Sequence, residues 1–281
     1  MSRKLFCQLG PTAYRISVWK GRILRKGKDV LSGRRFAREK SLDPLEVCII
    51  KHNSLIRRRL GNVDMELQEN KAVNLSLAAP LVSGILIRPG ETFSFWHLVG
   101  RTSERRGFRE GLTISSGETS RGIGGGMCQF TNLIHWMVLH TPLTIVEHHH
   151  HDGMDLFPDF NRQIPFGTGT SICYNYLDYR FRNDTDATYQ LFVWVDGEYL
   201  RGELRSDRPQ RWKYHIRTEG EGFVREAGTV YRVGRVWREA VDPATGNRVE
   251  RKLIRENHAR VMYDTSNLEI REEIPEENSG N

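Results

Sequence analysis

Long apolar runs are missing from this sequence of 281 residues. A helix that crosses a membrane needs about 20 consecutive, mostly apolar residues, and the chain has no such window. The opening stretch, MSRKLFCQLGPTAYRISVWKG, carries basic side chains but lacks the apolar centre of an export signal. We therefore expect a cytoplasmic protein whose only contact with a membrane is peripheral.

Cysteine is scarce, and the motifs that would commit it to a metal or to disulfide exchange are absent. The four cysteines are Cys7, Cys48, Cys128 and Cys173, and none of them forms a C-x-x-C pair. Their spacing argues against a zinc ribbon and against a thioredoxin-type motif. The glycine-rich stretch 122–128 lacks the Lys-Ser/Thr of a phosphate-binding P-loop. We expect reduced cysteines and no cofactor.

Acidic residues are rare at the start of the chain. Residues 1–62 contain 16 of the 42 Lys and Arg but only 4 of the 35 Asp and Glu. Such a segment attracts acidic partners or forms a solvated basic face. Residues 12–38 mix apolar and basic side chains like an amphipathic helix on an anionic membrane surface, although three glycines weaken that helix. Nucleic acid is not favoured as a partner, because no aromatic-platform motif is present.

Hydrophobic spacing predicts an α+β fold. The apolar periodicity predicts helices over 63–83 and 128–140. Alternating and turn-flanked segments predict strands around 85–94, 112–115, 143–150 and 170–183, and hairpins with turns at 196–197 and 242–247. We expect N-terminal helices, a core helix packed on an antiparallel sheet, and a β-rich C-terminal part.

The charge distribution and the expected helices and strands, together with the family resemblance described below, divide the chain into four regions. We expect a basic, mainly helical N-terminal region (1–62), a core (63–200), a β-rich C-terminal extension (201–267) and a disordered acidic tail (268–281). The tail has five glutamates and one arginine, which is typical of disorder.

One cysteine stands where a turn meets a helix. Gly124, Gly125 and Gly126 precede it, and the expected helix begins at Cys128. Consecutive glycines suit a tight turn. The positive end of a helix favours a thiolate over a thiol, and the backbone N–H of Gln129 and its neighbours could stabilise an oxyanion. This is the arrangement that a cysteine nucleophile needs.

A nucleophilic thiol also needs a base, and the sequence VEHHHHDG supplies four successive histidines. On a strand, His149 and His151 share one face, and their two neighbours share the other. Asp152, or Asp178 on the next expected strand, could orient the base. A thiol on a helix followed by a base on strands is the plan of papain-like hydrolases and transferases, which is an analogy at the level of fold.

Three other interpretations stay open. A cysteine at a helix start is often only a small packed side chain. The histidines could bind a metal together with Cys128 or Cys173, although successive strand residues alternate in direction, so no metal ligand is assigned. A non-catalytic module could use the glycine-rich loop and nearby arginines to hold a carboxylate or phosphate.

Four blocks occur in a recognisable order: RPGETFSFWHLVG (88–100), GIGGGMCQFTNLIHW (122–136), IVEHHHHD (145–152) and YLDYRFRN (176–183). Together they resemble the VanW family, which is named after a member encoded in vancomycin-resistance clusters. The resemblance covers about residues 67–196. It implies a connection with the cell wall and, by itself, no particular reaction.

The resemblance singles out residues position by position. In the first block they include Glu91 and Thr92, and in the second Gly124, Gly125, Gly126, Cys128 and Gln129. His149 and His151 match the family's paired histidines, and Asp178 and Asn183 match the last block. The pair Thr131-Asn132 stands where many members have Ser-Thr, so a hydroxyl role at the second position is in doubt.

From these residues we expect a cysteine-dependent hydrolase or acyl/peptidyl transferase. Cys128 is the expected nucleophile, His149 or His151 the base, and Asp178 or Asp152 the orienting group. The substrate is expected to be a small molecule or peptide that is acidic and related to the cell wall, such as a precursor. The expected ligand-binding residues are Gly124, Gly125, Gly126, Gln129, Glu91, Thr92, Arg101 and Arg121, with Arg105 and Arg106 nearby.

Overall fold

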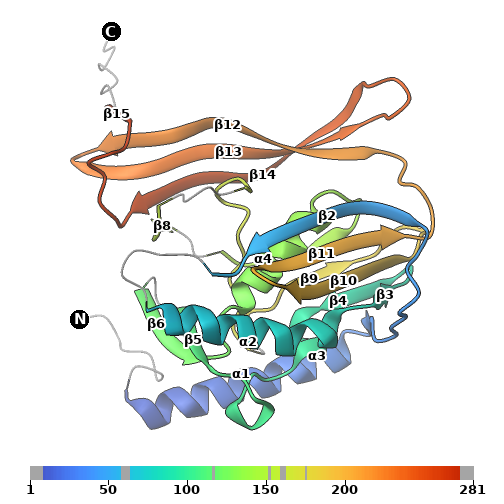
Figure 1. Cartoon of the computed structure of the whole chain (residues 1–281), viewed down its shortest axis with the longest axis horizontal. Coiled ribbons are helices and arrows are strands. Elements are labelled where there is room, and N and C mark those ends of the chain that lie inside the picture. The colour runs from blue at the N-terminus through green and yellow to red at the C-terminus, as the bar shows by residue number, and fades with distance from the viewer. Residues whose placement is uncertain are drawn as a thin grey trace.

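The computed structural model describes residues 9–57, 64–115, 118–150, 153–158, 163–174 and 176–272. Figure 1 shows a core of helices and short sheets, with a long C-terminal sheet on one side and helix α1 along the opposite side. The arrangement confirms the α+β class. Among the described residues, no helix has the length and apolar character needed to cross a membrane.

The core combines helices with two four-stranded sheets. The helical elements are α1 (Pro11–Leu31), α2 (Met65–Val82), α3 (Phe95–Val99), the 3₁₀ turn η2 (Glu104–Arg106) and α4 (Met127–Val138). One sheet has the order β1-β4-β9-β7, from Arg35–Phe36, Glu91–Ser94, Arg180–Arg182 and Thr144–Glu147. The other has the order β2-β11-β10-β3, from Val47–Leu55, Tyr199–Ser206, Tyr189–Asp196 and Ile85–Ile87.

Helices α2 and α4 form where the apolar spacing predicts them. Phe130, Ile134 and Met137 of α4 are fully buried in the core, which confirms its predicted apolar stripe. Asp64 caps α2 by accepting a hydrogen bond from the backbone N–H of Glu66 at 2.9 Å. The helix continues through Pro80 to Val82.

The described part of the N-terminal region contains two strands as well as helix α1. Strand β2 pairs with β11 along most of its length, and β1 pairs with β4, so both belong to the core sheets. Helix α1 runs unbroken through Gly21 and Gly27. Glycine weakens a helix by about 1 kcal/mol, and contacts with the core, described below, offset that cost.

The long C-terminal sheet has the order β15-β12-β13-β14-β8. Its strands are Ile270–Glu272, Lys213–Glu226, Thr229–Val241, Arg248–Val261 and Met154–Asp155. The two predicted hairpins are confirmed as β10–β11 and β13–β14. Strand β11 crosses the expected boundary at residue 200, and β15 shows that the expected tail is not disordered over Ile270–Glu272. Residues 273–281 lie outside the described part of the chain.

Two predicted local structures differ from the observed ones. The expected strand over 170–183 is reduced to an isolated bridge between Cys173 and Leu177 and the short strand β9. Conversely, β5 (Glu110–Ser115) and β6 (Glu118–Ile123) form a hairpin in which we expected only one strand. Strand β6 ends at the glycine-rich loop, so this hairpin helps to position α4.

Candidate ligand-binding site

A cavity of about 720 Å³ contains the predicted nucleophile. Its walls come from α2, from the start of α4, from segments within 153–174 and from β14 of the C-terminal sheet. Gly124, Gly125, Gly126 and Cys128 all line it. The glycine-rich stretch and Cys128, which the sequence singled out, therefore form part of the cavity wall.

The glycine-rich loop is shaped by close backbone packing. A Cβ on Gly125 would lie 2.5 Å from the carbonyl carbon of Gly111, so no side chain fits there. Gly126 caps α4 with a φ of 105°, a left-handed conformation that favours glycine. The side chain of Asn74 donates to the carbonyls of Gly125 and Arg109, each at 3.0 Å. This buried amide fastens the loop to α2 and fixes the start of α4.

Cys128 is the second residue of α4 and is half-buried. Burial raises the pKa of its thiol above the ordinary value, and a hydrogen bond with the backbone of Ile172 lowers the pKa by less than burial raises it. The direction of this pKa shift is opposite to the effect that we expected from the helix start. Desolvation disfavours the charged sulfur more strongly than local dipoles favour it.

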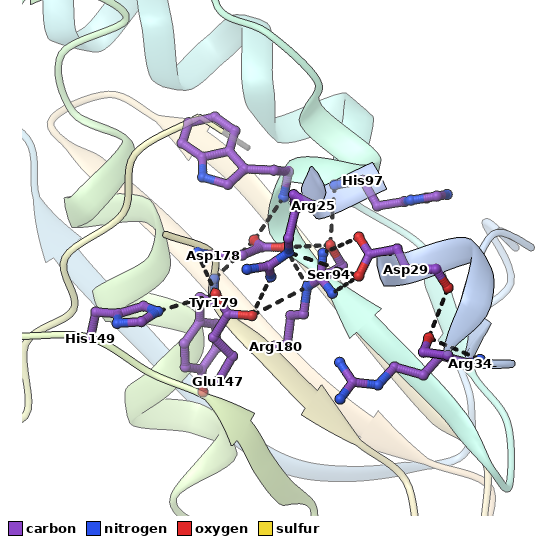
Figure 2. Close-up of polar contacts among 12 residues, drawn as sticks. Arg25, Asp29, Arg34, Ser94, His97, Glu147, His149, Asp178, Tyr179 and Arg180 are labelled. Carbon is purple, nitrogen blue, oxygen red and sulfur yellow. Dashed lines mark hydrogen bonds and ion pairs between the residues drawn. The ribbon is translucent and has the colours of Figure 1, made fainter. Parts of the chain in front are cut away.

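The histidines diverge as strand alternation predicts. Nε2 of His149 lies 3.1 Å from Oε1 of Glu147, which also pairs with Arg25 of α1 (Figure 2). His149 is not among the residues that line the cavity, whereas His150 is. Among the described histidines of this run, His150 is therefore the one that lines the cavity together with Cys128. His151 and Asp152 lie outside the described residues.

His148 and His150 form a cluster of rings with His135 of helix α4. The ring of His148 lies 4.1 Å from those of His135 and His150, measured between centroids. Nε2 of His148 is 2.9 Å from the carbonyl oxygen of Gly169. His135 is fully buried and its Nδ1 lies 3.0 Å from the hydroxyl of Tyr179.

Asp178 is a buried structural acceptor. Its carboxylate accepts from Ser94 Oγ at 2.5 Å, from the backbone N–H of Trp96 at 3.0 Å and from Arg180 Nε at 2.7 Å (Figure 2). Glu147 lies between Asp178 and His149, because its Oε1 accepts from the backbone N–H of Asp178 at 2.9 Å. The carboxylate that contacts His149 is thus Glu147, a residue that the sequence analysis did not single out.

The other predicted ligand-binding residues fall into two groups. Gln129 and Arg101 line the cavity, and Gln129 also donates to Ser54 Oγ and to the carbonyl of Leu55, each at 2.8 Å. Glu91, Thr92 and Arg121 are not cavity residues. Glu91 and Thr92 belong to β4 and its preceding turn.

Arg121 projects from β6 and is 58% exposed. Its guanidinium lies near the carboxylates of Asp64 and Glu110, at 3.8 and 4.0 Å. Arg105 and Arg106 are not cavity residues either, and Arg106 donates to the carbonyls of Val99 and Arg101. Of the four arginines that we expected to bind the ligand, the structure places Arg101 in the cavity.

Sequence analysis missed three cationic residues of the cavity: Arg22 from α1, Lys71 from α2 and Arg255 from β14. Lys71 is 9% exposed, and its aliphatic stem packs over Gly126. The sequence feature that could have indicated Lys71 is its spacing of three residues from Gln68 and from Asn74, two other polar residues on the buried face of α2. Nothing local to the sequence connects Arg22 and Arg255 with Cys128, because tertiary packing brings them together.

Positive charges outnumber negative ones among the described residues that line this cavity. The single carboxylate among its described lining residues is Asp155, which is 2% exposed. Asp155 already accepts from Tyr263 at 2.9 Å and lies 3.5 Å from Arg232. Within the described parts of the chain, no group of three or more His, Cys, Asp or Glu side chains is arranged to hold a metal ion.

These features define an α+β protein with a cation-lined cavity at the start of a core helix. A family model described as "VanW like protein" matches residues 70–205. The chain is 40% identical over 200 residues to the vancomycin B-type resistance protein VanW of Enterococcus faecalis, covering 71% of this chain and 72% of that protein. The chain therefore belongs to the VanW family.

A second relative covers less. The uncharacterized protein YoaR of Bacillus subtilis is 30% identical over 118 residues, which is 41% of this chain and 36% of that protein. No solved structure matches the chain significantly. The family membership rests on the Enterococcus relative and the family model, and neither relative's printed name describes a reaction.

Proposed function

We propose that this protein binds an anionic, cell-wall-related ligand in the cavity beside Cys128. The observation that carries the proposal is the described part of the lining, in which Arg22, Lys71, Arg101 and Arg255 accompany one carboxylate, Asp155. Arginine and lysine recognise carboxylates and phosphates through charge-assisted hydrogen bonds. Asp155 already accepts from Tyr263 and lies 3.5 Å from Arg232, so its carboxylate is engaged within the protein.

The start of α4 adds to the attraction for an anion. The first N–H groups of a helix lack partners within the helix and carry partial positive charge. Gly126 has no side chain that could shield them, and Gly124 and Gly125 bring further backbone into the wall. A ligand with a carboxylate or a diphosphate would meet backbone donors at one end and cationic side chains around it.

The name of the Enterococcus relative links that protein with vancomycin resistance. Uridine-diphosphate-linked precursors of the cell wall carry a diphosphate and peptide carboxylates, the two groups that the cavity lining favours. The described cavity, at about 720 Å³, lies within the usual range of small-molecule sites. An acidic precursor of this class is therefore the substrate class that we propose.

The test is isothermal titration calorimetry of the full chain with a uridine-diphosphate-linked muramyl pentapeptide. We expect Lys71→Met and Arg101→Gln each to weaken binding by about tenfold or more, because each loses a charged hydrogen bond. Arg121→Gln is the matched control, since Arg121 is exposed and outside the cavity. Binding of all three variants with equal affinity, or no binding by the wild type, would contradict the proposal.

A second candidate function is cysteine-dependent acyl transfer or hydrolysis in the same cavity. It is favoured by one observation: Cys128 and His150 line this cavity together. His150 would accept the thiol proton, the sulfur would attack an amide carbonyl carbon of the ligand, and the departing amine would take the proton back. The acyl group would remain on sulfur as a thioester until water or another amine accepts it.

Mass spectrometry of the protein after incubation with the same pentapeptide separates the two functions. The enzymatic candidate predicts an acyl adduct on Cys128, or a shortened peptide, that disappears in Cys128→Ala and decreases in His150→Gln. His149→Gln is the matched control, because that imidazole lies against Glu147. If Cys128→Ala binds normally and the wild type forms neither adduct nor product, only the binding function remains.

A further inference from the structure

Helix α1 presents one face to the core, and specific contacts fix that face. Arg22, Arg25 and Asp29 lie three and four residues apart, so they project from the same side of the helix. The guanidinium of Arg22 lies 5.0 Å from the ring centre of Tyr174. Arg25 pairs with Glu147, and Asp29 accepts from Arg180 at 2.6 and 2.7 Å (Figure 2). These contacts determine which way the helix faces.

The outward face of α1 is apolar and exposed. Ile16, Ile23 and Val30 are spaced by seven residues, or about two turns, so they form one stripe. Their exposed fractions are 50%, 47% and 81%. Trp19 lies next to this stripe and is 66% exposed. Isolated exposed apolar residues are ordinary on a protein surface, but Ile16, Trp19 and Ile23 are three and four residues apart and so lie side by side on this face.

Basic side chains flank this stripe. At 100° per residue, Lys20 and Lys26 project on either side of the line through Ile16, Ile23 and Val30. Both lysines are exposed, as is Arg15 in the first turns of the helix. The one acidic residue of α1 is Asp29, which faces the core and pairs with Arg180. The outward face therefore combines apolar and positive character without a negative charge.

We propose that this outward face of α1 docks the protein on an anionic membrane surface. The apolar stripe would enter the boundary between headgroups and acyl chains, Trp19 would lie at headgroup depth, and the lysines would contact lipid phosphates. A second copy of this chain fits less well, since two such faces would bring lysines against lysines. Figure 1 shows α1 on the side of the core away from the long C-terminal sheet, so that sheet does not block the approach.

The experiment is flotation of the full chain with vesicles made from a two-to-one mixture of phosphatidylcholine and the anionic lipid phosphatidylglycerol. We expect the wild type to float with these vesicles, and to float at least fivefold less with pure phosphatidylcholine or at high salt. The double variant Trp19→Ser/Ile23→Ser should lose most of the vesicle binding, because it lacks two apolar side chains of the stripe. The double variant Lys20→Gln/Lys26→Gln should also lose most of the binding, because it lacks two positive charges that contact lipid phosphates.

The matched control is Val249→Ser/Leu253→Ser, which removes apolar side chains that are 48% and 41% exposed on β14. This variant should float like the wild type. Circular dichroism and thermal unfolding verify that every variant is folded. The proposal would be overturned if the folded wild type did not float, or if the α1 variants floated as well as the wild type. It would also be overturned if light scattering showed a dimer of the wild type that the Trp19/Ile23 variant does not form.

Discussion

Arg180 and Asp29 form an ion pair with two parallel hydrogen bonds between residues 151 positions apart in the sequence. Their side chains are 3% and 17% exposed, so the pair is largely shielded from water. Arg180 also donates to the buried carboxylate of Asp178 at 2.7 Å, two residues before it in the chain. The pair therefore joins the basic N-terminal helix to the residues that hold the core together (Figure 2).

Replacing Asp29 tests whether this pair holds α1 in place. Asp29→Asn should lower the free energy of unfolding by about 1.5–3 kcal/mol, because a buried guanidinium loses a charged partner. Urea denaturation at pH 7 measures the difference. Asp184→Asn is the control, since its partner Arg182 is 50% exposed and such pairs contribute about 0–1 kcal/mol. Equal effects of the two substitutions would show that the α1 contact contributes little.

His135 predicts how stability depends on pH. Burial holds the pKa of this imidazole well below 6.5, and the neighbouring His148 and His150 lower it further. The unfolded chain therefore binds a proton below about pH 6.5 that the folded chain does not bind. Stability should fall with decreasing pH in that window, by up to about 1.4 kcal/mol per pH unit from this group.

His135→Gln removes the titrating group. Between pH 7.5 and pH 5.5, the free energy of unfolding should therefore decrease in the variant by about 1 kcal/mol less than it decreases in the wild type. Urea denaturation curves at the two pH values give the change in the free energy of unfolding with pH for each protein. Each protein is compared with itself at pH 7.5, so a constant loss of stability in the variant does not affect the result. Identical slopes in the two proteins would mean that His135 does not cause the pH dependence.

The parts of the fold that local sequence pattern specifies were predictable. The apolar stripe of α4 and the Asp196–Gly197 hairpin depend on residues close together in the chain, and both are as predicted. Strand β2 was not predictable in this way. It forms by pairing with β11, which lies more than 140 residues later in the chain, after helices α2 and α4. Register with a distant strand leaves no local signal.

The candidate site divides in the same way. The turn of three glycines before Cys128 indicated a constrained helix start, which the structure contains. Strand alternation separated His149 from its neighbours, but it could not tell which face meets the cavity. Which face meets the cavity depends on Glu147, which contacts His149, and on Arg25, which pairs with Glu147 from 122 residues earlier in the chain. The raised thiol pKa likewise follows from burial, and burial is a property of the folded chain.

Gly125 tests the packing that shapes the cavity wall. An added Cβ would lie 2.5 Å from the carbonyl carbon of Gly111 and 2.8 Å from the backbone nitrogen of Leu112, and neither atom can move alone. Gly125→Ala should therefore lower the free energy of unfolding by about 3 kcal/mol or more, as overpacking against backbone does. Urea denaturation measures the loss.

Gly197→Ala is the control for that substitution. Gly197 has a φ of +58°, but an added Cβ there would meet nothing within 4 Å. Its variant should lose about 1 kcal/mol through backbone strain alone. If Gly125→Ala costs no more than Gly197→Ala, the loop is free to move and the close approach to β5 does not fix the start of α4.

Cys128 gives the prediction that separates a packed thiol from an activated one. In the free protein its raised pKa and half-burial should make it react with iodoacetamide at pH 7.5 about fivefold or more slowly than exposed Cys48, because the thiolate is the reacting form. The pKa of Cys48 is also raised by burial, so exposure makes the larger difference. Peptide mass spectrometry resolves the rate at each site. A ligand in the cavity should slow Cys128 further and leave Cys48 unchanged, whereas faster alkylation of Cys128 than of Cys48 would place the enzymatic candidate ahead of simple binding.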